Sequence, residues 1–124
     1  MKAIATNKAP QAKGTYSQGI ETNGVIYTAG QIGLDPATGE LVQGAMAQVR
    51  QVFENIRQVC IAGGGNLSSI AKLTVYLTDL ADWPLVNEAM AELFSEPYPA
   101  RTAIGVAALP FGAVVEMEAI VVAG

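Results

Sequence analysis

Two glutamates and one arginine near the end of the chain have the types and spacing that chemistry needs. Glu116 and Glu118 alternate with apolar residues, so both project from one face of an extended strand, roughly 7 Å apart. One such carboxylate can hold an attacking water while the other stays structural. The competing interpretation is a wet face, or a pair neutralised by Arg101 or Lys72. Glycosidase carboxylates share this spacing, but 124 residues with a single Trp offer little for a sugar cleft.

Arg101 opens a predicted strand directly after Pro-Tyr-Pro-Ala, so a rigid turn fixes its backbone. Its planar guanidinium can present two parallel donors to a carboxylate. A ligand clamp and a structural ion pair are both open at this point. Arg50 and Arg57 lie on the polar side of a predicted helix, where solvated charges are expected.

Three further side chains are considered for a functional role. Tyr16 stands between polar residues ahead of a strand and serves either as a packing anchor or as a site residue. Asn87 flanks an apolar helix stripe, so its amide needs a partner or a cavity. Cys60 falls on an apolar helix face and is expected to be inert core. The glycine-containing segment at 14–19 lacks the phosphate-loop pattern and no helix signal follows it.

The composition excludes several classes of function. With no His and one Cys, the chain cannot build a His-dependent triad, a His-ligated metal site or an internal disulfide. The lone thiol favours a reducing compartment, so a cytoplasmic location is expected. A net charge of -4 argues against a nucleic-acid partner. No apolar run approaches the ~18 residues of a membrane span, and no signal-peptide core is visible.

The elements that must position these residues follow from local patterns. One domain over 1–124 is expected. Its first half should contain a hairpin turning at 22–24 and a helix over 45–60. A strand over 70–78 and a helix from 82 should follow, and then strands over 101–107 and 113–122 joined by a turn at 109–112. Glycines 63–65 end the first helix, Asp82 caps the second, and prolines 97 and 99 stop it. The arrangement is α+β, with helices able to cover one sheet face.

The apolar patterns also predict which faces are buried. The strand over 70–78 should bury Ala71, Leu73, Val75 and Leu77, and the second helix should bury Trp83, Val86, Met90, Leu93 and Phe94. The last strand carries apolar residues on both faces, with Ile120 and Val122 opposite Met117 and Val121. Since 51% of the chain is hydrophobic and only 15% charged, the second face is expected to meet another subunit.

Six segments, spread over the chain, carry a resemblance to a known family. They are Ala-Pro-Gln-Ala-Lys-Gly-Thr-Tyr-Ser-Gln-Gly at 9–19, Ala-Gly-Gln-Ile at 29–32, Val-Tyr-Leu-Thr-Asp-Leu at 75–80, Val-Asn-Glu at 86–88, Pro-Ala-Arg at 99–101 and Val-Glu-Met-Glu-Ala-Ile at 115–120. In this order and spacing they closely resemble the RidA (YjgF) family of reactive-intermediate deaminases.

The resemblance implies a chorismate-mutase-like fold, in which a mixed sheet of about six strands has two helices on one face. It implies a homotrimer that packs through its sheets and has an active site in each cleft between subunits. By the same resemblance, Arg101 binds the substrate carboxylate and Glu116 positions the water. The other residues that the resemblance places in the cleft are Tyr16, Asn87, and the backbone at Gly30 and Ala103.

The implied activity is hydrolytic deamination of 2-aminoacrylate, 2-iminopropanoate and 2-iminobutanoate to 2-keto acids and ammonia. Because an imine carbon is already electrophilic, no metal or cofactor is expected. Thr15, Ala29 and Ala103 depart from common family residues, and Ala103 removes any role for a thiol. The alternative is a non-catalytic trimeric protein that binds small carboxylates or acts as a chaperone. The ribonuclease label often given to the family is disfavoured by the acidic charge and the lack of His.

Overall fold

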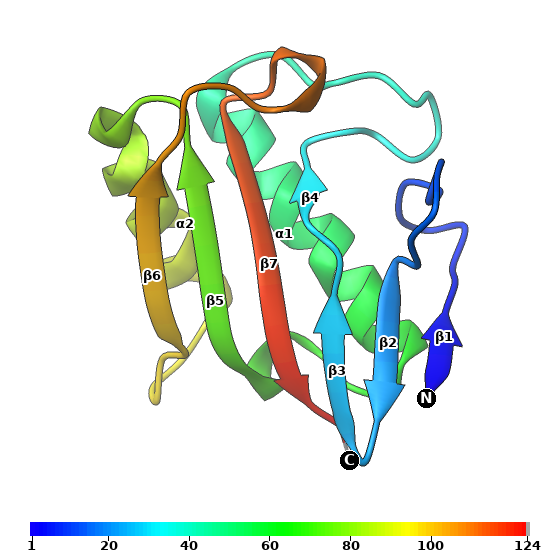
Figure 1. Cartoon of the computed structure of the whole chain (residues 1–124). Helices are drawn as coiled ribbons and strands as arrows, with labels where there is room; N and C mark the ends of the chain where they lie inside the picture. Colours follow the sequence, from blue (N-terminus) through cyan, green and yellow to red (C-terminus); the bar gives the residue numbers. More distant parts are fainter. Residues whose placement is uncertain (124) are drawn as a thin grey trace.

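One mixed seven-stranded sheet, with two helices on the same face, makes up the structure (Figure 1). The structure is a computed structural model that describes residues 1–123. The helices are α1 (Ala45–Ala62) and α2 (Trp83–Leu93), and the strands are β1 (Lys2–Ile4), β2 (Gly19–Thr22), β3 (Val25–Thr28), β4 (Gln31–Ile32), β5 (Ile70–Leu77), β6 (Ala100–Gly105) and β7 (Val115–Val122). The α+β prediction is confirmed, with one strand more than the six expected.

The strand β7 lies inside the sheet and connects its two halves. The order is β1-β2-β3-β7-β5-β6, with β4 also paired to β7. Among the strands of residues 1–123, β5 and β6 run parallel and the other neighbours are antiparallel. The predicted hairpin joins β2 to β3, and Asn23 and Gly24 both take a positive φ there, as a tight two-residue turn requires. This order leaves β1 and β6 as the edges.

The first helix forms where the apolar spacing predicts it. Its buried stripe includes Val49, Val52, Phe53, Ile56 and Val59, all essentially inaccessible to solvent. The helix ends as predicted, because the backbone N–H groups of Gly63, Gly64 and Gly65 bond back to carbonyls of its last turn. Gly64 has a φ of 93°, which an L side chain rarely adopts. Neither helix in residues 1–123 has both the length and the apolar character that crossing a bilayer requires.

The start of the second helix differs from the prediction. Asp82 stands at its N-cap position but with helical backbone angles, so its side chain makes no capping bond. Asp79 caps instead, accepting the Ala81 N–H at 2.9 Å in the short 3₁₀ turn that precedes α2. The buried stripe of α2 is Val86, Ala89 and Met90, followed by Phe94 just beyond its end.

Three residues predicted to be buried are exposed. Trp83 and Leu93 are the first and last residues of α2, and they are 48% and 43% exposed. Ala71 is displaced by a bulge, because the pairing of β5 with β7 shifts register between Ile70 and Lys72. The bulge turns Ile70 into the core in place of Ala71. The rest of β5 alternates as predicted.

The sheet face opposite the helices carries apolar side chains, as predicted from β7. Val115, Met117, Ala119 and Val121 are buried beneath α1, whereas Val122 on the other face is 57% exposed. Tyr27 and Ile120 share this open face, and no element of residues 1–123 covers it. All six residues of the edge strand β6 are exposed as well.

Candidate functional site

The two predicted carboxylates project from the open face of β7, in different surroundings. Glu118 accepts a hydrogen bond from the Tyr76 hydroxyl at 2.8 Å. Glu116 is half-buried, and this burial, followed by the nearby negative charge of Glu118, raises the pKa of its carboxyl above the usual value. Glu116 is therefore the carboxylate better able to exchange a proton with a ligand, and Glu118 is the structurally held one.

Gly30 lies so close to Glu116 that a side chain added there would displace the carboxylate. Ile32 on β4 pairs with Glu116 on β7, which brings the preceding Gly30 alongside the carboxylate. A Cβ atom placed on Gly30 would lie 2.7 Å from Glu116 Oε2 and 2.9 Å from its Cδ. The backbone at Gly30 and the Glu116 carboxylate thus form one wall of a candidate site.

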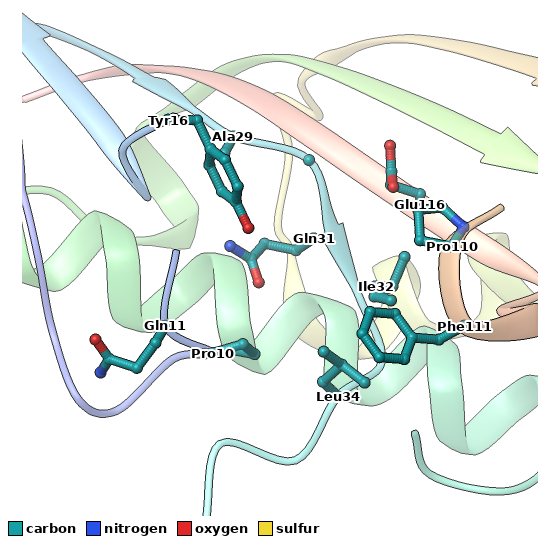
Figure 2. A pocket seen from close by; sticks show the side chains of 11 residues that line it. Pro10, Gln11, Tyr16, Ala29, Gln31, Ile32, Leu34, Pro110, Phe111 and Glu116 are labelled. Atoms are coloured by element: carbon teal, nitrogen blue, oxygen red, sulfur yellow. The ribbon is translucent and has the colours of Figure 1, made fainter. Parts of the chain in front are cut away.

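A cavity of about 410 Å³ opens beside this wall (Figure 2). Figure 2 shows the Tyr16 hydroxyl directed toward the Gln31 amide. Tyr16 is 57% exposed, so it does not anchor the packing of this chain's core. Buried Gln18 steadies the segment before β2, because its amide bonds the Thr6 N–H and the carbonyls of Thr6, Ala9 and Pro10.

Arg101 lies on the edge strand β6 and faces the second helix. Its Nη1 donates to Asn87 Oδ1 at 2.5 Å and lies 3.6 Å from Met90 Sδ. Within residues 1–123 the ion pairs are Arg50 with Glu92 and Arg57 with Glu54, so Arg101 has no carboxylate partner. The structural ion pair that the sequence left open at Arg101 is not formed.

A second cavity of about 420 Å³ lies in front of this guanidinium. Its walls are Asn87, Met90, Ala91, Tyr98 and Pro99 together with Arg101. Ala103 follows two residues later on the same exposed strand, so it shares the face of Arg101. This cavity combines a cation, an amide and an aromatic ring, which suits a small carboxylate.

One chain does not bring the two cavities together. Arg101 pairs with Leu73 on β5, whereas Glu116 pairs with Tyr76, three residues further along and one strand beyond. Strand geometry then puts their Cα atoms about 14 Å apart. Arg101 points toward α2, while Glu116 points to the open face. The predicted site residues therefore form two half-sites: Arg101 and Asn87 in one, and Tyr16, Gly30 and Glu116 in the other.

The remaining sequence interpretations are settled by contacts. Lys72 does not neutralise the glutamates, because its Nζ donates to Thr102 Oγ1 at 2.7 Å. Cys60 is fully buried, and burial raises the pKa of its thiol to about 11, so it is inert as predicted. In residues 1–123 no cluster of three or more His, Cys, Asp or Glu is placed to hold a metal ion.

Several lining residues carry no periodic signal in the sequence. Gln31 and Ile32 form the two-residue strand β4, which is too short for a periodic pattern, and only the resemblance through the segment at 29–32 marks them. Leu34 follows just after that strand. Pro110 and Phe111 belong to the turn at 109–112, where the sequence predicts only a connection. The one signal is Phe111 itself, an aromatic residue in a Pro-Phe-Gly turn where a polar residue is usual.

A family model and a named relative both match nearly the whole length of this chain. The family model described as Endoribonuclease L-PSP matches residues 6–123. A bovine protein named 2-iminobutanoate/2-iminopropanoate deaminase is 44% identical over 124 residues, covering 99% of this chain and 90% of that protein.

Solved structures show the same likeness in three dimensions. RidA from an Antarctic Psychrobacter has a TM-score of 0.96 at 51% identity, with 98% of this chain and 99% of that chain covered. E. coli TdcF with bound serine has a TM-score of 0.95 at 38% identity, with both chains covered completely.

Proposed function

We propose, because this chain belongs to the RidA (YjgF) family, that it hydrolyses 2-imino acids and their enamine tautomers to 2-keto acids and ammonia. The observation that carries the proposal is the unpaired Arg101 guanidinium, held by the neutral Asn87 at the mouth of a cavity. A cation without a carboxylate partner is available to a carboxylate substrate. The two compounds in the name of the bovine relative, 2-iminopropanoate and 2-iminobutanoate, carry such a group.

We propose further that the complete site forms between two copies of the chain. The Arg101 half-site and the Glu116 half-site lie on different faces, and neither has both the cation and the carboxylate. The exposed edge strand β6 and the apolar open face with Val122 offer surfaces through which copies can meet. A homotrimer in which Arg101 of one copy faces Glu116 of the next completes three such sites.

The chemistry assigned to these residues is a water addition followed by loss of ammonia. Arg101 fixes the substrate carboxylate, which sets the imine carbon near Glu116. The Glu116 carboxylate accepts a proton from water as the water oxygen bonds to the imine carbon, and the imine nitrogen takes up a proton from solvent. Glu116 then gives its proton to the amine nitrogen as the carbon–nitrogen bond breaks, and the hydroxyl proton returns to solvent as the carbonyl group forms. One imine and one water thus give one keto acid and one ammonia.

The test couples the protein to a serine or threonine dehydratase, which releases 2-aminoacrylate or its homologue. Semicarbazide added as a trap competes with the protein for the imine, so an active protein lowers the yield of semicarbazone. Arg101→Ala should return the yield to that of the spontaneous reaction, while Arg57→Ala, which removes a surface ion pair, should behave as wild type. Equal trapping with and without the wild-type protein would refute the proposal.

One observation favours a second candidate, a protein that binds small carboxylates without turnover. The E. coli TdcF structure contains serine, an amino acid with the same carboxylate and backbone as the imino acids' precursors. Calorimetry with serine and with 2-oxobutanoate distinguishes the two functions when combined with the trapping assay. Binding that depends on Arg101 without any effect on trapping selects the binding protein.

A further inference from the structure

The cavity beside Glu116 has an apolar wall that the proposed chemistry does not use. Ile32, Leu34, Pro110 and Phe111 form this apolar wall, and Glu116 is the one charged residue among the described residues that line the cavity. Figure 2 shows the Phe111 ring on the same side as Ile32 and Leu34, with the Glu116 carboxylate directed away from them. The proposed activation of water uses the Glu116 carboxylate, so no step assigned so far uses the apolar wall.

Phe111 is unusual both in its backbone and in its exposure. Its φ of 60° and ψ of 14° lie in the left-handed region, which a bulky side chain rarely adopts. Its ring is 72% exposed, and among residues 1–123 only Met1 is a more exposed large apolar side chain. Neither the turn nor the core therefore explains a phenylalanine here, because glycine or asparagine would suit the backbone better.

We propose that the apolar wall is the subsite for the substrate side chain and that Phe111 is a specificity-determining residue. This inference rests on the proposed function and names its preferred substrates: 2-imino acids whose aliphatic side chains have three or four carbons. A cavity of about 410 Å³ exceeds what a methyl or ethyl group fills. The absence of charge along the apolar wall favours an aliphatic group over a polar one.

The size of the effect follows from apolar burial. Each methylene moved from water into an apolar contact contributes about fourfold to binding. A four-carbon side chain has three more carbons than that of 2-iminopropanoate, and Phe111 supplies one part of the surface that they contact. Phe111→Ala should therefore lower the preference for the longer substrate by about fivefold to tenfold, with little change for 2-iminopropanoate.

The experiment measures kcat/KM for 4-methyl-2-iminopentanoate and 2-iminopropanoate, each released from its amino acid by an amino-acid oxidase and followed by semicarbazide competition. The variants are Phe111→Ala, Phe111→Leu as an intermediate, and Ile61→Ala as an exposed apolar control on α1. The ratio of the two kcat/KM values should fall in the order wild type, Phe111→Leu, Phe111→Ala, and stay unchanged in Ile61→Ala. Circular dichroism and sedimentation verify fold and assembly for each variant.

An unchanged ratio in Phe111→Ala overturns the inference while leaving the deaminase function intact. The same holds if Phe111→Ala changes assembly without changing the ratio. If the wild type accelerates neither reaction, the proposed function fails, and calorimetry with 4-methyl-2-oxopentanoate and 2-oxopropanoate decides the inference alone. A binding preference for the longer acid that Phe111→Ala removes then supports the subsite, and equal or absent binding overturns it.

Discussion

Gly30→Ala should abolish most of the activity while leaving the fold as stable as before. The added Cβ would lie 2.7 Å from Glu116 Oε2, whereas unstrained contacts need about 3.5 Å, so the carboxylate must move by about 1 Å. A displacement of that size at a reacting group costs roughly 100-fold in rate. The backbone of Gly30 has no positive φ, so alanine adds no backbone strain. Alanine also lowers the conformational entropy of the unfolded chain, which offsets about 0.4–1 kcal/mol of the free-energy cost of the close contact.

The assay compares kcat/KM for 2-iminopropanoate and the melting temperature in four proteins: wild type, Gly30→Ala, Glu116→Asp and the double variant. Because aspartate withdraws the carboxylate by one methylene, Gly30→Ala should cost much less in the Glu116→Asp background. Gly105→Ala is the matched control, since its Cβ would meet the movable Leu80 side chain at 3.2 Å. Additive losses in the double variant, or full activity in Gly30→Ala, would refute the reasoning.

The other predictions concern charge, protons and assembly. Arg101→Lys keeps the charge but loses the planar fork, so KM should rise about tenfold or more; an unchanged KM contradicts a two-pronged clamp. Asn87→Asp should also raise KM, because a carboxylate beside Arg101 competes with the substrate, and this rise should shrink at high salt. Glu116→Gln should lower kcat by ~100-fold or more, and Glu118→Gln less; the reverse order would exchange their roles. Activity should fall as pH drops through the raised pKa of Glu116, because the protonated carboxyl no longer accepts a proton from water. Since Glu118 contributes to raising this pKa, Glu118→Gln should shift the acidic limb of the pH–activity profile to lower pH. Val122→Asp should dissociate or aggregate a trimer at micromolar concentration in sedimentation equilibrium, and normal assembly would mean that the open face is not an interface.

The elements that the sequence predicts well are those whose signals are local and repeated. In α1, every turn adds an apolar residue to the same stripe, so the helix can be identified from its pattern and its glycine end. In β7, strict alternation separates the buried Met117 from the outward Glu116, and the same alternation is enough to place both glutamates on one face. Such patterns depend little on the rest of the chain.

The mistaken details depend on contacts between distant segments. Ala71 fits the alternation of β5, but a bulge against β7 shifts it outward, and nothing in the local residues marks that bulge. Asp82 has the residue type of a helix cap, yet the preceding 3₁₀ turn already gives it helical angles and leaves capping to Asp79. The two-residue strand β4 forms only because β7 is there to pair with it.

The same distinction applies to the candidate site. The types of its residues can be recognised locally, whereas which of them lie close together depends on the whole fold. Arg101 and Glu116 can be selected from residue type, turn chemistry and resemblance, whereas their separation onto two faces follows from the pairing register, in which Arg101 pairs with the buried Leu73 and Glu116 with Tyr76 of the open face.

This difference of face also explains why Arg101 can remain unpaired in a chain with a net charge of -4. Arg101 points toward α2, whereas Glu116 and Glu118 point to the open face from β7, on the far side of β5. Asn87 orients the cation without neutralising it. In the assembly proposed above, a second copy brings Glu116 to the substrate, so the arrangement that keeps Arg101 free is also the one that calls for two copies.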